Sequence, residues 1–286
     1  MTPARPLPDG RALSLVMPAY GSAGYIAQNV RRVLDFFEAA GIDGEVIVAD
    51  DGSTDGTADA VEEIDRDDVV TVLRLAHAGK GAALRAGMAA ATGRIRAFTD
   101  ADLPYGPEPL QLAMRYIEER RFHAVIGDRT LPGSTFEPAG ALRSAVSELA
   151  SFAFRTLVTG GIYDTQCGFK VFRGDVADEV FGLTRIDGFA IDVELIYLIL
   201  KYRLDLKRIP VRLERNAPSS VRVIRDSASA VRDIATIRWN WARGRYRSET
   251  LADLLATEVR ADIEAAAPQG PPATRGTATA RPDQPD

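Results

Sequence analysis

The sequence predicts an α/β fold in which a mostly parallel sheet is flanked by helices, with amphipathic helices at the C-terminal end. Short apolar runs, typical of buried strands, alternate with helical segments over residues 13–99. Carboxylates and other polar residues gather directly after these runs. Repeated strand–helix units imply right-handed crossovers, so the strands lie parallel and their ends meet at one edge of the sheet, where ligands bind.

Apolar spacing and its interruptions give the elements in order. Apolar runs predict strands over residues 13–17, 45–49, 69–75 and 94–99. Helical spacing predicts helices over 25–40, 57–64 and 81–91, and Gly41 and Gly93 end the first and the third. Further helices are expected over 107–120, 139–158, 176–183, 191–202, 222–241 and 250–266, and further strands over 124–126 and 206–213. From residue 268 onward the lack of periodicity predicts a disordered tail.

Composition excludes several classes of protein. The chain has 286 residues, of which 46% are hydrophobic and 26% charged, as in ordinary globular proteins. A net charge of −5 argues against a nucleic-acid-binding protein. One cysteine and two histidines exclude an internal disulfide and argue against a cysteine- or histidine-based metal site. Without a secretory signal or a run of ~20 apolar residues, we expect a cytoplasmic protein, with peripheral contact to the cytoplasmic face of a membrane left open.

Asp100 and Asp102 follow the predicted strand over 94–99. Two carboxylates one residue apart can direct oxygens toward one hard cation, and Mg²⁺ or Mn²⁺ prefers such ligands together with water and substrate phosphates. An Asp-x-Asp alone occurs in ordinary loops. At the end of a strand in such a sheet, it favours a metal site.

A second acidic motif, DDGSTDGT at residues 50–57, follows the strand over 45–49. A strand–turn–helix junction explains its glycines, with Asp55 or Thr57 as the helix cap. It does not explain Asp50 and Asp51, because charge at a strand end is costly without a partner. A nucleotide base or ribose would supply the missing N–H and O–H donors.

These motifs and their spacing resemble the family-2 glycosyltransferases with the Rossmann-like GT-A fold, and most of all the polyprenyl-phosphate (dolichyl-phosphate) glucosyl- and mannosyltransferases. The matching segments are 17–20 (MPAY), 50–57, 79–87 (GKGAALRAG), 99–105 (TDADLPY), 127–129 (GDR), 164–170 (DTQCGFK), 189–195 (FAIDVEL) and 223–227 (VIRDS). Segment 164–170 favours the dolichyl-phosphate glucosyltransferase branch. The resemblance implies a catalytic domain over 1–241, a helical appendage over 242–267 and the tail over 268–286.

The resemblance also implies which residues bind the nucleotide sugar: Pro18, Ala19, Tyr20, Asp50, Asp51, Lys80, Asp100, Ala101 and Asp102. Tyr20 would lie near the base, and Asp51 would hydrogen-bond uracil or guanine. Asp100 and Asp102 would hold the metal against the diphosphate. Lys80 would lie near the nucleotide or its sugar, in a loop whose backbone N–H groups also favour anions; a solvated lysine is the alternative. Where the family has Asn and an acidic residue, this chain has residues 21–23 (GSA), which leaves the donor base open.

The residues implied in binding the acceptor phosphate are Arg129, Arg143, Gln166, Lys170, Arg222 and Arg225. Arginine suits this task because its planar fork of donors carries a fixed charge. A surface ion pair is the alternative for Arg129 and Arg143. Gln166 and Lys170 are placed in a turn that borders the acceptor.

The implied catalytic residues are Asp102, Arg129, Asp192 and Glu194. Asp192 and Glu194 lie two apart on a predicted helix and face different directions, so one is expected near the sugar and the other in a structural role. A sugar hydroxyl as acceptor needs a general base, whereas a phosphate monoester with a second pKa of ~6 is already ionised. His77 and His123 are assigned no role.

Residues 222–247 are rich in arginine, with tryptophan and aliphatic residues interleaved. A basic amphipathic helix with tryptophan can lie on an anionic membrane surface. A helix packed on the domain with a solvated arginine face is the alternative.

The resemblance implies an inverting, metal-dependent transferase that moves a hexose from a nucleotide sugar to a polyprenyl phosphate. The favoured hexose is glucose, with UDP-glucose as donor. GDP-mannose as donor and a soluble acceptor are alternatives. A nucleotidyltransferase is less favoured because residues 17–21 lack the arginine that its loop needs. A non-catalytic nucleotide-sugar-binding scaffold is the remaining alternative, and the sequence leaves the oligomeric state undetermined.

Overall fold

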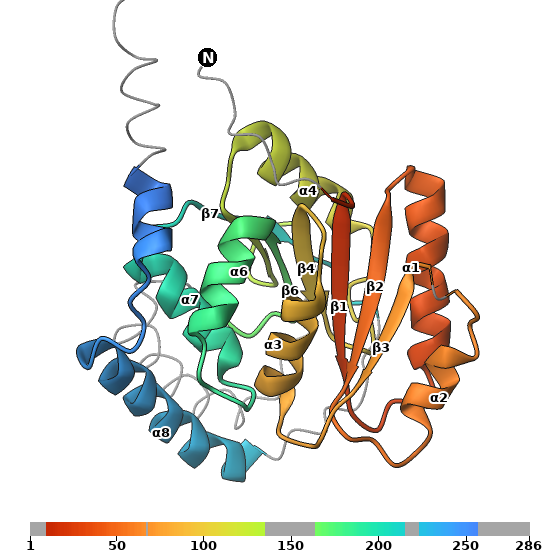
Figure 1. The fold of residues 1–286 in the computed structure, drawn as a ribbon, viewed down its shortest axis with the longest axis horizontal. Coiled ribbons are helices and arrows are strands. Elements are labelled where there is room, and N and C mark those ends of the chain that lie inside the picture. The colour runs from red at the N-terminus through yellow and green to blue at the C-terminus, as the bar shows by residue number, and fades with distance from the viewer. Residues whose placement is uncertain (1–9, 67, 135–163, 215–222, 257–286) are drawn as a thin grey trace, which may run out of the picture.

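The computed structural model describes residues 10–66, 68–134, 164–214 and 223–256, and of residues 223–231 the helical backbone alone. In this part of the chain, one sheet of seven strands carries helices on both faces (Figure 1). The strands are β1 (Leu13–Ala19), β2 (Gly44–Asp50), β3 (Val70–Arg74), β4 (Ile95–Thr99), β5 (Ala124–Asp128), β6 (Phe169–Arg173) and β7 (Leu206–Pro210). Their order is β3-β2-β1-β4-β6-β5-β7, and only β6 runs antiparallel to its neighbours. The predicted α/β fold with a mostly parallel sheet is confirmed.

Alternation along the strands divides the core between the two faces of the sheet. Leu13, Leu15 and Met17 of β1 face one layer, made by α1 (Ile26–Ala40), α2 (Thr57–Glu62) and α4 (Pro109–Arg120). Val16 and Phe98 face the other layer, made by α3 (Lys80–Ala90), α6 (Gly174–Leu183) and α7 (Ile191–Lys201). Because helices cover the sheet on both sides, ligands can reach the strands only at their ends.

Strand β6 was not predicted, because segment 164–170 was interpreted as a turn. It lies between β4 and β5, with Phe169 opposite Thr99. Two charged residues, Lys170 and Arg173, interrupt its apolar run, yet both are buried and each is ion-paired with a carboxylate. Arg173 pairs with Asp175 two residues further on, whereas the partner of Lys170 lies 22 residues away, so the burial of Lys170 leaves no local signal. The helix predicted over 139–158 lies outside the described residues.

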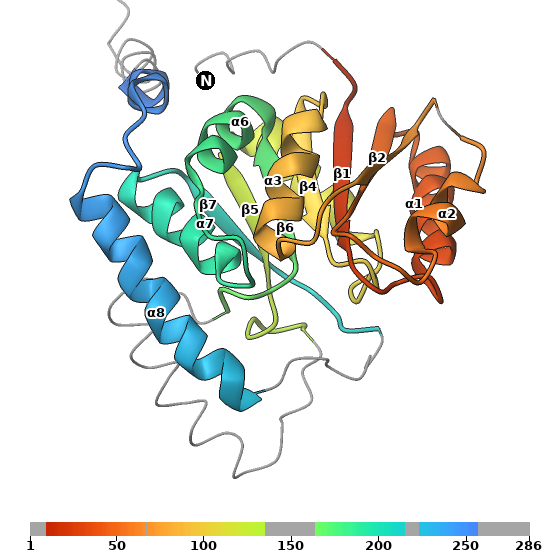
Figure 2. The same ribbon diagram turned by 60° about the horizontal axis from the view of Figure 1, so that its bottom comes forward.

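Helix α8 (Val223–Ala242) lies across the outer side of α7 (Figures 1 and 2). After it the chain turns back, and a further helical stretch covers 249–256. Tyr246 and Leu251 are fully buried in the core that α6 and α7 share. The described part of the predicted appendage thus packs on the domain itself, while the tail over 268–286 lies outside the described residues. No described helix has the length and apolar character needed to cross a membrane.

Candidate functional site

The carboxyl ends of the strands bring the predicted binding residues to one edge of the sheet. β1 and β2 end side by side, with Ala19 opposite Asp50, and β4 ends next to them. Asp100 follows β4 directly, and the antiparallel β6 begins at the same edge. Gly168 packs so closely on Asp100 that an added Cβ would lie 1.8 Å from its Oδ2. A side chain at position 168 would therefore displace the Asp100 carboxylate.

Lys80 is the centre of a charge cluster at this edge. It is the first residue of α3, and its Nζ lies 2.8 Å from Asp100 Oδ1 and 3.1 Å from Asp192 Oδ2. Asp192, in the first turn of α7, also pairs with Lys170 of β6. The Lys170 ammonium donates a further hydrogen bond of 2.8 Å to the carbonyl oxygen of Cys167. Helices α3 and α7 and strand β6 are thereby joined beneath Asp100.

The charges in this cluster stabilise one another. Burial alone would lower the pKa of Lys80, but the carboxylates of Asp100 and Asp192 outweigh it and raise that pKa above its ordinary value. Burial would raise the pKa of Asp192, but the ammonium groups of Lys170 and Lys80 outweigh it and lower that pKa. At neutral pH the cluster therefore contains an ionised Asp192 and a protonated Lys80.

The two residues predicted to hold a metal lie at the accessible side of the cluster. The Asp100 side chain is 37% exposed, and Asp102 is half-buried in the turn that follows. Their oxygens are the hard donors that Mg²⁺ and Mn²⁺ prefer, so the residues present fit such an ion. Among the described residues, no group of three or more His, Cys, Asp or Glu side chains is arranged so that it could hold a metal ion on its own. An ion held here would need further ligands from the substrate and from water.

The side of the edge where the sequence predicts the nucleoside is built around Asp51. Its carboxylate accepts hydrogen bonds from the backbone N–H of Ala78 (2.8 Å) and of Gly79 (2.9 Å), which ties the end of β2 to the loop before α3. His77, which was assigned no role, places its Nδ1 2.9 Å from Asp51 Oδ2. The His77 ring stacks on the exposed ring of Tyr20, with centroids 4.4 Å apart. A sequence signal for His77 was lacking because its partners come from two other loops.

Asp50 has a local role in the same region. Its buried carboxylate accepts hydrogen bonds from the backbone N–H and the hydroxyl of Ser53. This shapes the turn after β2, and Ser53 Oγ accepts a hydrogen bond from the Gly21 N–H. The structure therefore places Asp50 beneath the loop that carries Tyr20.

The backbone amides around Lys80 were predicted to favour an anion, but those of Gly79, Gly81 and Ala82 already donate to acceptors within the protein. The N–H groups of Gly81 and Ala82 donate to the carbonyl oxygen of Asp187, over 2.6 and 3.3 Å, and that of Gly79 donates to Asp51. A Cβ at position 81 would lie 2.1 Å from the Ile186 carbonyl oxygen, so only glycine lets this loop approach. Because these amides already have partners, positive charge at the start of α3 comes from the Lys80 side chain.

Glu194 supports that loop from the other side. Its buried carboxylate accepts hydrogen bonds from the N–H groups of Arg185 (2.9 Å) and Ile186 (3.0 Å) and from the hydroxyl of Tyr246. Burial raises its pKa, although these hydrogen bonds oppose the rise. The structure does not bring Glu194 to the charge cluster. Asp192 and Glu194 point in different directions, as expected. Between the two, Asp192 is the one that lies at the site.

The residues predicted to bind the acceptor phosphate do not all lie in the positions expected for that role. Arg129 forms a bidentate ion pair with Asp164, with Nε–Oδ2 and Nη2–Oδ1 distances of 2.8 and 2.7 Å. Gln166 is exposed. Lys170 lies in a strand rather than in a turn and is buried against Asp192, so its ammonium does not face an acceptor. Three further predicted residues, Arg143, Arg222 and the side chain of Arg225, lie outside the described part.

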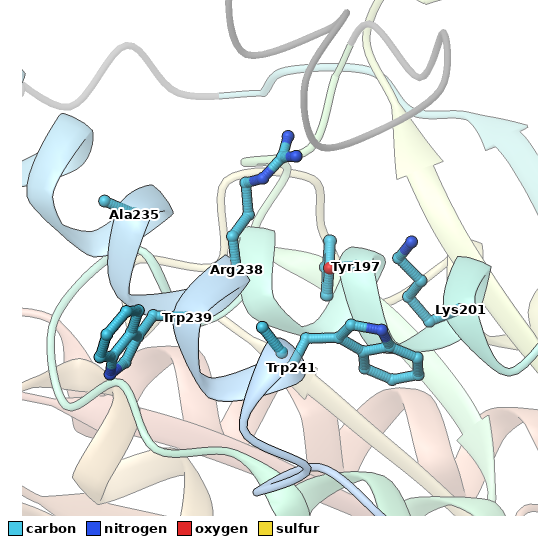
Figure 3. Close-up of a pocket in the computed structure, with 7 residues that line it drawn as sticks. Tyr197, Lys201, Ala235, Arg238, Trp239 and Trp241 are labelled. Carbon is cyan, nitrogen blue, oxygen red and sulfur yellow. The ribbon is translucent and has the colours of Figure 1, made fainter.

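A groove between α7 and α8 is lined by aromatic and basic residues (Figure 3). Lys201 lies over the rings of Tyr197 and Trp241, which meet edge to face. Trp239 is 55% exposed and points away from this trio, with the Arg243 guanidinium 4.2 Å from its ring centre. None of the residues of the charge cluster lines this groove.

Comparison with known proteins shows to which class of protein this chain belongs. The family model for glycosyl transferase family 2 matches residues 14–181. This chain belongs to glycosyl transferase family 2 and is a glycosyltransferase. It is similar to the dolichyl-phosphate beta-glucosyltransferase of Saccharomyces cerevisiae, with 27% identity over 82% of this chain and 76% of the relative. The enzyme of the same name from Drosophila melanogaster is 32% identical over 70% of this chain and 66% of the relative.

Solved structures confirm the GT-A fold. Mannosyl-3-phosphoglycerate synthase from Rubrobacter xylanophilus superposes with a TM-score of 0.64 at 19% identity, over 84% of this chain and 77% of that one. Glucosyl-3-phosphoglycerate synthase from Mycobacterium tuberculosis, solved with Mn²⁺, UDP-glucose and phosphoglyceric acid, gives a TM-score of 0.58 at 20% identity, over 83% and 80% of the chains. The same enzyme has also been solved with Mg²⁺ and UDP.

Proposed function

We propose that this chain transfers glucose from UDP-glucose to a polyprenyl phosphate, with inversion at the anomeric carbon and with a divalent metal ion. The observation that carries the proposal is the meeting of Lys80, Asp100 and Asp192 at the carboxyl edge of the sheet. The relatives named dolichyl-phosphate beta-glucosyltransferase support the choice of sugar and acceptor. A β-linked product from an α-linked nucleotide sugar requires inversion.

The chemistry needs positioning and charge rather than a base. An oxygen of the acceptor phosphate attacks the anomeric carbon and forms a C–O bond, while the bond to the diphosphate oxygen breaks and UDP leaves with the electron pair. Because a phosphate monoester has a second pKa of ~6, no proton has to be removed at neutral pH. Asp192, already committed to two lysines, would hold Lys80 in place, and Lys80 would stabilise the charge that develops on the leaving diphosphate.

Asp100 and Asp102 would hold Mg²⁺ or Mn²⁺ at the accessible side of the cluster. The bound ion would neutralise charge on the diphosphate of the leaving group. Asp100 would then be shared between that ion and Lys80, which lies 2.8 Å from its Oδ1.

For the acceptor phosphate we propose Arg129 and Gln166, together with Arg143, Arg222 and Arg225. Asp164 occupies Nε and Nη2 of Arg129, which fixes the plane of the guanidinium. The hydrogen bonds to Asp164 raise the pKa of Arg129, burial opposes the rise, and the charge of Asp164 adds to it, so the group stays charged. A fixed, charged fork is suited to a phosphate group.

We propose further that the exposed face of α8, together with Lys201 at the end of α7, rests on an anionic membrane surface. Trp239 is exposed beside Arg243, and Arg238 and Lys201 line the adjacent groove (Figure 3). Aromatic rings settle at the headgroup level, and basic side chains are attracted by anionic lipids. A lipid-linked acceptor would meet the enzyme at such a surface.

The proposal is tested with the full chain, labelled UDP-glucose, Mn²⁺ and a short polyprenyl phosphate. Label is expected in the organic phase, and chelation of the metal or Asp102→Ala should abolish transfer. Asp43→Asn is a matched control, because this exposed carboxylate precedes β2 at the opposite edge of the sheet and should leave activity unchanged. Transfer from GDP-mannose alone, or only to a soluble acceptor such as phosphoglycerate, would contradict the proposed donor or acceptor.

A further inference from the structure

His77 lies on the nucleoside side of the edge, and its contacts define where its hydrogen sits. Nδ1 lies 3.0 Å from the backbone carbonyl oxygen of Asp51 and 2.9 Å from Oδ2 of the same residue. Both of these atoms only accept hydrogen bonds, so Nδ1 must carry the hydrogen. In the neutral ring, Nε2 then keeps its lone pair and acts as an acceptor.

The imidazole is held in place and is open to a ligand. It stacks on Tyr20 with 26° between the ring planes, and its side chain is 58% exposed. Gly52 has a φ of +76°, and a Cβ there would lie 2.7 Å from the His77 backbone nitrogen, so the turn after β2 supports the loop directly. Within the described part of the chain, Nε2 has no hydrogen-bond partner. An oriented acceptor therefore faces outward beside an exposed aromatic ring.

We propose that His77 is a specificity-determining residue that recognises the base of the nucleotide donor by accepting a hydrogen bond at Nε2. Uracil and guanine present a ring N–H on the edge that such an acceptor would meet. Cytosine and adenine present a bare ring nitrogen there, and two facing lone pairs leave both groups unsatisfied. This inference rests on the proposed function, because it requires a nucleotide-sugar donor.

A purely supporting role for His77 makes a different prediction. Without His77, Asp51 keeps its hydrogen bonds from the backbone N–H groups of Ala78 and Gly79, so the loss of a purely supporting ring would weaken every nucleoside diphosphate to a similar degree. If Nε2 contacts the base, its loss changes the ratio of affinities for UDP and CDP, which differ on that edge alone. The affinity ratio therefore separates recognition from support.

The test is calorimetric titration of the full chain with UDP and with CDP in the presence of Mn²⁺, for the wild type, His77→Phe and His77→Gln. Phenylalanine keeps a ring against Tyr20 but has no acceptor, and glutamine can place an amide oxygen near the position of Nε2. The wild type should prefer UDP, and H77F should lose about five- to tenfold of that preference, mainly through weaker UDP binding. H77Q should recover part of it.

The outcomes separate the two claims. An unchanged UDP/CDP ratio in H77F overturns the inference while the proposed function stands. A wild-type chain that binds no UDP in the presence of metal overturns the proposed function itself. Since the ring is exposed, the variants should keep the thermal unfolding midpoint of the wild type, and this is measured on the same samples.

Discussion

Replacing Lys170 and Asp192 by neutral residues, singly and together, tests whether their buried ion pair holds the charge cluster in place. Lys170 is 1% exposed and Asp192 is 2% exposed, so either charge alone would be buried without its main partner. Removing one member of such a pair typically costs about 3–5 kcal/mol, because the other charge stays desolvated.

The contacts rank the single variants. Lys170→Met leaves Asp192 with Lys80, so we expect a loss near the lower limit, about 3 kcal/mol in the free energy of unfolding. Asp192→Asn leaves Lys170 with the Cys167 carbonyl oxygen as its remaining partner and should cost about 4 kcal/mol. The double variant has no stranded charge at this position, and Lys80 keeps Asp100. It should cost about 4 kcal/mol rather than about 7, a coupling of about 3 kcal/mol.

Urea unfolding followed by tryptophan fluorescence measures these energies, with the denaturant slope checked for each variant. Thermal midpoints should fall by roughly 2–4 °C per kcal/mol in a chain of this size. Single variants that cost less than about 1 kcal/mol, or a double variant that matches their sum within about 0.5 kcal/mol, would refute the reasoning. The pair would then be an incidental contact and not the support of Lys80.

Two further predictions concern the membrane surface and pH. Arg238→Gln combined with Arg243→Gln should weaken binding to phosphatidylserine vesicles in a cosedimentation assay about tenfold or more, since each basic residue near such a surface contributes about 1 kcal/mol. Arg115→Gln is the matched control, because Arg115 is an exposed arginine on α4. Equal sedimentation of the double variant and the control would contradict the proposed membrane-binding surface. The folded-state pKa of Asp192 lies below its ordinary value of 3.8, so the unfolded chain binds more protons below that pH and the stabilisation is lost as pH falls through the folded pKa. The difference in unfolding free energy between the wild type and Asp192→Asn should therefore shrink below pH 3.8, and a constant difference would contradict the assigned charge state.

The sequence predicts the parallel half of the sheet because those strands are apolar and end in polar turns. Strands β1, β2, β3 and β4 lie close to their predicted ranges. Strand β6 was missed because Lys170 and Arg173 look like surface residues until their carboxylate partners are known. The partner of Lys170 in particular could not be identified from the local pattern, because Asp192 lies 22 residues further along the chain, on α7.

In the candidate site, too, residues with a local sequence signal could be predicted and residues defined by distant contacts could not. Asp100 and Asp51 could be predicted, since each directly follows an apolar strand in a parallel sheet. His77 could not, because its importance comes from contacts with Tyr20 and Asp51 that only the folded chain makes. The loop held by Glu194 is a similar case, as its amide partners lie eight and nine residues away outside any helix.

Charge balance supports the proposal that a metal ion and the donor diphosphate bind together at this edge. In the cluster, Asp100 and Asp192 balance the ammonium groups of Lys80 and Lys170, so it offers a diphosphate no net positive charge. A divalent cation would supply that charge, and a diphosphate would in turn supply the oxygen ligands that two carboxylates leave unfilled. Each ligand thus improves the site for the other, and by linkage the two affinities must rise by the same factor. Lys80, at 2.8 Å from Asp100 and 3.1 Å from Asp192, screens the repulsion between these two carboxylates and holds Asp100 at the edge where the ion would bind.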